Sequence, residues 1–252
     1  MPVATLARSV LLEARRGGLP WLAAAVLAVG LGAAAFLSQV ALTDTAALQL
    51  AVLAALLRAC AVFLIAAQVT GATLREIQDK GLELMLSLPL SRTTHYLGRL
   101  AGFAACAAIL AAVFCAVLLF WAAPLPAILW GVSLALEGAL VAAAALFFAM
   151  TLPSLVSAIA ATVGLYLLAR AMPAIQAMAA APLPEEGWGG WLARHAVDAI
   201  AFLLPRLDVA TRTEWLVYGT SAAEVAAAVG GMVFYIVLLA AAGLVDFHRR
   251  NL

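Results

Sequence analysis

The sequence predicts an all-α integral membrane protein with six transmembrane helices, and three observations support this fold class. The 252 residues are 67% hydrophobic and 11% charged, whereas soluble domains are roughly half apolar and a quarter charged. Six apolar runs are long enough to cross a membrane, which takes roughly 20 helical residues. These Ala-, Leu- and Val-rich runs do not alternate with polar residues, which favours helices over barrel strands. We therefore expect a single transmembrane domain over residues 1–252.

The apolar runs give the expected boundaries of the six spans. The expected spans cover residues 19–42, 46–69, 96–123, 127–152, 154–172 and 222–245. Residues 4–16 precede them, with Leu6, Val10 and Ala14 on one side of a helix, and this pattern predicts an amphipathic helix in the interfacial layer. An unstructured basic tail is the alternative. A cleaved secretory signal is disfavoured, because the following apolar run exceeds the usual ~7–15 residues.

The distribution of lysine and arginine predicts the orientation, because these residues are enriched on the cytoplasmic side. With both termini in the cytoplasm, most basic residues lie inside: Arg8, Arg15, Arg16, Arg75, Lys80, Arg92, Arg99, Arg249 and Arg250. Those outside flank or occupy one long segment: Arg170, Arg194, Arg206 and Arg212. The sequence thus predicts a multi-pass membrane protein with both termini in the cytoplasm.

Several function classes are disfavoured by missing motifs. The cysteines Cys60, Cys106 and Cys115 lie within expected spans and have neither disulfide nor metal-ligand spacing. The chain has no phosphate-binding loop, nucleophile elbow or zinc-protease motif. With a net charge of +1, nothing indicates a nucleic-acid partner. We expect no metal site, no cofactor in this chain and no enzymatic activity.

Residues 71–89 form a charged, helix-patterned segment between two apolar runs. Thr73 and Glu76 fit a capping box, which predicts that a helix begins at Thr73. Glu76 and Lys80 are four residues apart in the favourable order. Gly81 weakens the middle of this helix, and Pro89 ends it at Leu88. We expect a helix over residues 73–88, with Ser91 capping the next one. A simple soluble linker is the alternative.

Two intramembrane charges are predicted, Arg58 in the second span and Glu137 in the fourth. An isolated charge there costs at least ~2.5–3.5 kcal/mol, so both should be buried against protein or water. At 1.5 Å per residue they lie at similar depths, roughly 18 Å and 16 Å from the outer ends of their spans, which permits an intramembrane pair. Either the two charges neutralise each other, or one lines a translocation route or an interface between halves.

Residues 173–219 are expected to form an external re-entrant or interfacial segment. Pro173 and Pro205 interrupt it, and Trp188, Trp191 and Trp215 suit an interfacial aromatic belt. We expect one or two short helices that dip toward the outer leaflet.

Several motifs together resemble the ABC exporter permeases of the second type. They are EIQDKGLELMLSLPLSR at 76–92, YLGRLAG at 96–102, LLPRLD at 203–208, EWLVYG at 214–219 and FHRRNL at 247–252. The six-span layout agrees as well, so the resemblance covers essentially the whole chain. In place of the family's Gly-Lys pair at the start of the third span, this sequence has Gly98-Arg99.

The resemblance implies a permease subunit of an ATP-driven exporter in the bacterial inner membrane. Its partners would be two cytoplasmic ABC ATPase subunits, which bind ATP and Mg, a second copy of the chain or a similar permease, and membrane lipid. The family's cytoplasmic coupling helix, which contacts the ATPase, maps onto residues 73–88 between spans two and three. Its expected contact residues are Thr73, Glu76, Lys80, Gly81, Glu83, Leu84 and Leu88.

The sequence leaves the substrate open, as well as the choice between homodimer and heterodimer. A gradient-driven secondary transporter and a membrane assembly scaffold without transport activity are the alternative functions. The transporter would need titratable intramembrane groups, of which Glu137 is a candidate.

Overall fold

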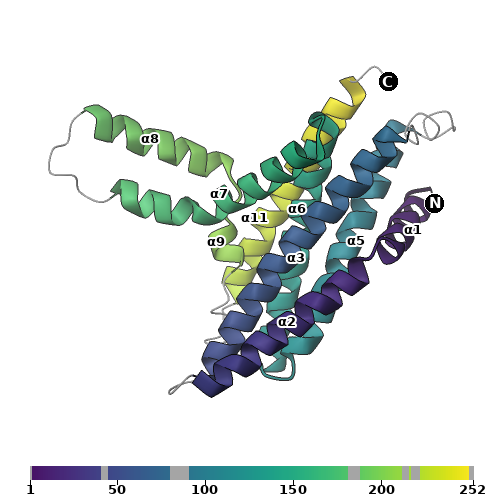
Figure 1. Ribbon diagram of the computed structural model, residues 1–252. Coiled ribbons are helices and arrows are strands. Elements are labelled where there is room, and N and C mark those ends of the chain that lie inside the picture. The colour runs from purple at the N-terminus through teal and green to yellow at the C-terminus, as the bar shows by residue number, and fades with distance from the viewer. Residues whose placement is uncertain are drawn as a thin grey trace.

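The computed structural model describes residues 2–40, 45–79, 91–180, 188–211, 216 and 222–249, and over these residues the regular structure is entirely α-helical (Figure 1). Within the described part of the chain, six helices are long and apolar enough to span a membrane. They are α2 (Leu19–Val40), α3 (Thr45–Gln78), α5 (Arg92–Leu118), α6 (Pro124–Thr151), α7 (Leu155–Ala180) and α11 (Ala222–Arg249). The prediction of an all-α membrane protein with six spans is therefore confirmed.

Three shorter helices complete the described structure. Helix α1 (Pro2–Arg16) precedes the first span, and α8 (Trp188–Leu203) and α9 (Leu207–Ala210) lie between α7 and α11. The last two match the short helices expected between the fifth and sixth spans.

The helices cross the bundle from one end to the other, so each helix end can be assigned to one of two ends of the bundle. Helix α1 lies at the upper end of the bundle in Figure 1, together with the C-terminal ends of α3 and α11 and the start of α5. The end of α2, the start of α3 and the connection from α5 to α6 lie at the lower end. We call these the α1 end and the opposite end. The two termini of the described chain thus share one end, as six crossings require.

Helix α6 occupies the centre of the bundle, packed against α3, α5, α7 and α11. In its most apolar stretch 67% of the residues are buried, compared with 17% for α2 and 11% for α11. Its beginning is set by Pro124 at the first position, where a missing N–H costs nothing. Helix α6 therefore provides the surface on which the intramembrane charges can be buried.

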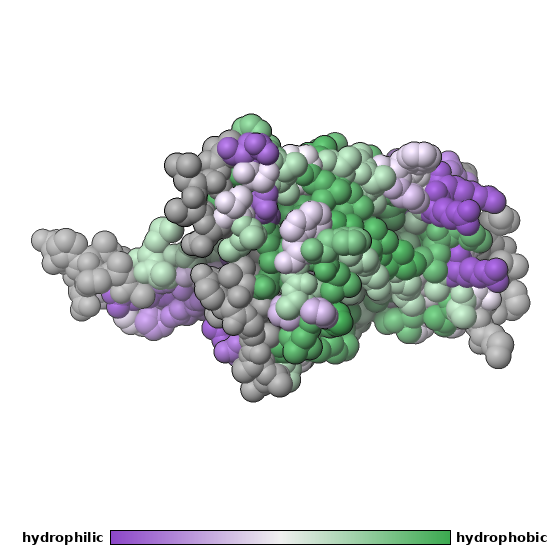
Figure 2. Space-filling model, turned by 90° about the horizontal axis from the view of Figure 1, so that it is seen from below, coloured by the Kyte–Doolittle hydropathy of each residue, from purple (hydrophilic) through white to green (hydrophobic). Residues whose placement is uncertain are grey.

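The outside of the bundle is apolar. Bulky side chains such as Trp21, Phe120 and Val156 are exposed. Seen from below, hydrophobic residues cover most of the middle of the molecule, and hydrophilic residues gather toward its two sides (Figure 2). Such a large apolar surface is suited to hydrocarbon rather than to water.

Helix α1 is not free to present its apolar side to lipid, because that side is packed on α5. Val10 and Ala14 are buried. A Cβ added to Gly98 would lie 2.8 Å from Leu6 Cβ, and one added to Gly102 would lie 2.7 Å from Val10 Cβ. The glycines of α5 therefore let α1 approach closely. Helix α1 includes the predicted residues 4–16, and its expected position in the interfacial layer of the membrane stays a prediction.

The prediction that a helix begins at Thr73 is wrong. Helix α3 runs without interruption from Thr45 to Gln78, so Thr73 lies inside it and is buried. Leu74 packs with Ala149 and Ala158 of α6 and α7. These tertiary contacts favour continuation of α3 over a local capping box. Ser91 caps α5 as expected, since its hydroxyl accepts a hydrogen bond from the Thr94 N–H.

Helix α7 also extends beyond its expected end, because it continues through Pro173 to Ala180. Proline is tolerated inside membrane helices when neighbouring groups satisfy the freed backbone. The outer part of α7 and the antiparallel α8 project sideways from the bundle, across rather than along its axis (Figure 1). We call this pair the lateral arm.

Candidate functional site

The two predicted intramembrane charges meet in the centre of the bundle. Nη1 of Arg58, on α3, lies 2.5 Å from Oε2 of Glu137, on α6, and the two side chains are 1% and 0% exposed. The intramembrane pair that the similar depths of the two residues permit is therefore formed, as a direct ion pair. Burying both charges is costly, so the pair needs further hydrogen bonds to be stable.

Polar groups of α6 complete the coordination of Arg58. Its Nη2 donates to the Ser133 hydroxyl at 2.9 Å, and this hydroxyl donates to the Trp130 carbonyl at 2.8 Å. The guanidinium carbon also lies 5.0 Å from the centroid of the Trp130 ring, which is within cation–π range. Two of the three guanidinium nitrogens therefore have hydrogen-bond partners.

Helix α7 supplies the other partners of Glu137. The Tyr166 hydroxyl donates to Oε1 at 2.8 Å, and Nη1 of Arg170 lies 3.8 Å from the same oxygen. Arg170 also donates to the Thr211 hydroxyl at 2.6 Å, just after α9. We call Arg58, Glu137, Tyr166 and Arg170 the central cluster. It joins α3, α6, α7 and the segment after α9.

The charge of the central cluster is unbalanced, because two arginines face one carboxylate. Arg58 is fully enclosed, whereas the Arg170 side chain is 39% exposed. The excess positive charge therefore lies on the side of the cluster nearer to α9. A site of this kind can hold helices in register or attract an anion.

A second group of charges lies near the α1 end, where the charged segment meets α5. Glu76 forms an ion pair with Arg99, and its Oε1 lies 3.8 Å from Nε2 of His95. Nη2 of Arg75 lies 3.9 Å from Oε1 of Glu13 on α1. We call Glu76, Arg99 and His95 the end cluster. The charges at the end of α3 therefore contact α1 and α5.

The sequence-predicted coupling residues fall into two groups. Thr73 and Glu76 lie in the last turns of α3, where Thr73 is buried and Glu76 contacts Arg99. The others lie outside the described residues: Lys80, Gly81, Glu83, Leu84 and Leu88. Their predicted role in coupling stays a prediction.

Sequence reasoning missed Tyr166 and Arg170 as partners of Glu137. Arg170 was expected on the outside, near the end of the fifth span, but it lies within α7 and reaches the central cluster. One signal was available, because Tyr166 and Arg170 are four residues apart, as are Ser133 and Glu137. This spacing places each pair on one helix face.

These features define a multi-pass helical membrane protein with an ionic cluster buried inside its bundle. Within the described residues, no group of three or more His, Cys, Asp or Glu side chains is arranged to hold a metal ion. Comparison of the chain with protein-family models finds no match, and comparison with curated proteins finds none either.

Proposed function

We propose that the chain is the membrane-spanning permease subunit of an ATP-driven exporter of the ABC type, in the bacterial inner membrane with both termini in the cytoplasm. Two copies of a separate ATPase subunit bind ATP and Mg²⁺ and hydrolyse the ATP. A second copy of the chain, or a similar permease, forms the other half of the translocation unit. The motif resemblance of residues 76–102 and the six-span bundle support this proposal.

The observation that carries the proposal is the continuity of α3. This helix has 34 residues and no proline, which corresponds to a length of about 50 Å at 1.5 Å per residue. It begins at the opposite end and ends at the charged segment of the α1 end. A displacement applied near Asp79 is therefore carried along a rigid helix into the bundle.

The central cluster is where such a displacement reaches other helices. Arg58, near the middle of α3, donates a hydrogen bond to Glu137 of α6, and Glu137 accepts another from Tyr166 of α7. A shift of α3 would therefore act on both neighbours. At the α1 end, the pairing of Glu76 with Arg99 makes α5 move with α3.

The test is ATP hydrolysis by the purified chain in complex with its ATPase subunit. We expect Leu84→Asp and Glu83→Lys to abolish the effect of the permease on hydrolysis, because both change the expected contact surface. Asp44→Asn, which in the sequence lies outside the predicted coupling residues 73–88, is the control and should hydrolyse ATP as the unaltered complex does. Normal hydrolysis in all three variants contradicts the assignment of residues 73–88 to coupling.

The orientation is tested separately, with a reporter that fluoresces only in the cytoplasm fused after Leu252. We expect a fluorescent fusion. A dark fusion that is inserted at normal levels would place the charged segment on the wrong side for a cytoplasmic ATPase, and the exporter proposal would fail.

A gradient-driven carrier is the second candidate, because Glu137 is a carboxylate buried within the bundle. A carrier would be inhibited when the ion gradient is dissipated in the presence of ATP, whereas the exporter would continue to work. An assembly scaffold would show no transport under either condition.

A further inference from the structure

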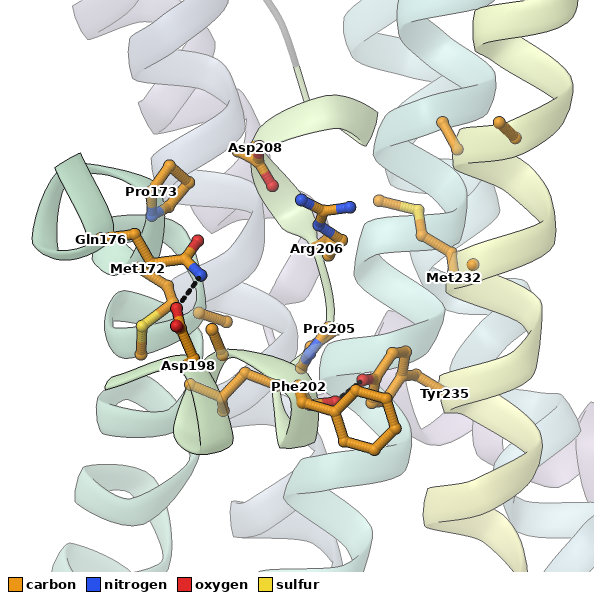
Figure 3. A pocket seen from close by; sticks show the side chains of 16 residues that line it. Met172, Pro173, Gln176, Asp198, Phe202, Pro205, Arg206, Asp208, Met232 and Tyr235 are labelled. Carbon is orange, nitrogen blue, oxygen red and sulfur yellow. Dashed lines mark hydrogen bonds between the residues drawn. The ribbon is translucent and has the colours of Figure 1, made fainter. Parts of the chain in front are cut away.

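A cavity of about 540 Å³ lies where the lateral arm meets the bundle, between α7, α8, α9 and α11 (Figure 3). Its lining residues on α11 run from Ala227 to Tyr235, in the first half of a span that covers Glu224–Arg249. Since α11 ends at the α1 end, the cavity lies within the membrane-spanning region, in the half remote from α1.

Most of the cavity wall is apolar. Met172, Phe202 and Met232 line it, and Phe202 is 88% exposed, so the cavity opens to the surroundings of the bundle. A Cβ added to Gly231 would meet nothing within 4 Å, which shows that open space lies next to α11. At this depth the surroundings are hydrocarbon, and an acyl chain would match the wall.

Charged side chains lie on the same cavity, at a break in the helical backbone. Arg206 immediately precedes α9 and Asp208 lies in its first turn, and both lie at the cavity in Figure 3. Among the described residues neither forms an ion pair. Asp198, on α8, also lines the cavity and accepts a hydrogen bond from Gln176 of α7 at 3.3 Å.

Such a combination is unusual inside a membrane. Irregular backbone is tolerated at membrane depth where it lines a cavity or is covered by protein, and ionisable side chains at that depth mark binding sites. Helix breaks near the middle of a membrane are a common way to bind charged parts of ligands. The cavity therefore has an apolar part and a charged part, as a site for an amphiphile requires.

We propose that this cavity binds a zwitterionic phospholipid with a phosphoethanolamine headgroup. The guanidinium of Arg206 binds the phosphate through charge-assisted hydrogen bonds. Asp208 accepts hydrogen bonds from the ammonium group, and the acyl chains lie along Phe202 and Met232. The volume is within the range of about 300–1,000 Å³ that is usual for ligand sites, which suits a headgroup and the first part of the chains.

The charges favour a zwitterion over an anionic lipid. An anionic headgroup would bring negative charge close to Asp208 and Asp198 with a single arginine to offset it, and like charges at short range are unfavourable. A purely cationic amphiphile would leave Arg206 unpaired and repel it. A headgroup with one charge of each sign pairs with both Arg206 and Asp208.

The test measures which lipid the purified full chain retains, without ATP or ATPase, so its outcome is independent of the exporter proposal. The chain is equilibrated in micelles with an equimolar mixture of phosphatidylethanolamine and phosphatidylglycerol, and bound lipid is counted by native mass spectrometry. We expect preferential retention of phosphatidylethanolamine. Gly231→Leu should abolish retention, because the side chain fills the cavity, whereas Gly230→Leu should not, since Gly230 has open space beside it but does not line the cavity.

Two charge variants test the headgroup assignment on side chains whose replacement leaves the apolar core intact. Arg206→Gln should weaken the binding of both lipids by about tenfold or more, the usual effect of losing a hydrogen bond to a charged group. Asp208→Asn should remove the preference for phosphatidylethanolamine. Equal retention of both lipids that is unchanged in Gly231→Leu would be nonspecific and overturns the proposal, and so does a preference of the unaltered chain for phosphatidylglycerol.

Discussion

The central cluster and the end cluster are built alike, since in each a glutamate faces two basic side chains, but their polar atoms are paired to different degrees. Glu137 is 0% exposed, and both of its oxygens accept hydrogen bonds. Glu76 is 15% exposed, and Nε and Nη2 of its partner Arg99 are buried without a hydrogen-bond partner among the described residues. Nε2 of His95 is in the same situation.

This difference in hydrogen-bond pairing indicates that the two clusters have different roles. A buried polar group that is left unpaired costs free energy, so a cluster with spare donors is favoured to bind something more. The central cluster has nearly all of its groups paired within the chain and therefore holds α3, α6 and α7 in one arrangement. Within the described residues, the end cluster has donors left for water, a partner or another arrangement of the α1 end.

The largest expected effect is that of Glu137→Ala. This substitution leaves Arg58 buried without its partner, and breaking a buried pair in this way costs ~3–5 kcal/mol of folding free energy. The measurement is the free energy of unfolding of the purified chain by denaturant in mixed micelles. A loss below that of the end-cluster variant described below would contradict the ranking of the two clusters.

The double variant Arg58→Met with Glu137→Leu distinguishes two hypotheses for the ion pair: that the two charges only neutralise each other, or that they take part in transport. Replacing both charges with apolar side chains of similar size is often neutral, so we expect most of the lost stability to return. If the pair only neutralises itself, function returns too. A stable double variant without transport activity would instead place the pair on the translocation route or at the interface between halves.

A smaller effect is expected for Glu76→Gln at the end cluster. The neutral amide keeps the shape of the side chain but leaves Arg99, which is 7% exposed, without its counter-charge. Because the end cluster lies nearer to water, we expect a loss of ~1–3 kcal/mol, less than for Glu137→Ala. The same unfolding measurement applies, and a loss as large as that of Glu137→Ala would show that both clusters are equally enclosed.

A comparable or smaller loss of folding free energy is expected for Gly102→Ala, which pushes α1 away from α5. A Cβ at Gly102 would lie 2.7 Å from Val10 Cβ and 3.1 Å from the Ala7 carbonyl oxygen. Overpacking of this kind costs ~1–3 kcal/mol, so Gly102→Ala should lower the free energy of unfolding. Gly164→Ala is the matched control, because nothing lies within 4 Å of its added Cβ, and it should not destabilise the chain.

The number of spans and the Arg58–Glu137 pair were predictable because they depend on local quantities. A membrane crossing requires a run of apolar residues, and depth along a helix follows from its constant rise. The spacing of Tyr166 and Arg170 places them on one helix face, but this alone did not identify Tyr166 as a partner of Glu137, because tyrosine is also an ordinary residue of membrane spans. Which face of α7 meets α6 depends on packing between the helices.

The errors arose where a local signal was opposed by tertiary contacts. The capping box at Thr73 predicted a helix start, but Leu74 packs against Ala149 and α3 continues. Pro173 predicted an interruption, but α7 continues through it into the lateral arm. Both signals describe what the chain would do in water, whereas lipid and neighbouring helices favour helical continuity.

The smallest effect is expected for Glu13→Gln, at the exposed margin of the α1 end. Its carboxylate lies 3.9 Å from Nη2 of Arg75, with side chains 44% and 61% exposed. Exposed pairs of this kind gain little, because water screens the charges and two long side chains must be ordered, so the free energy of unfolding should change by less than about 0.5 kcal/mol. Raising the salt concentration should remove even this difference. A loss comparable to that of Glu76→Gln would mean that Glu13 is shielded from water in the folded protein and that the end cluster extends onto α1.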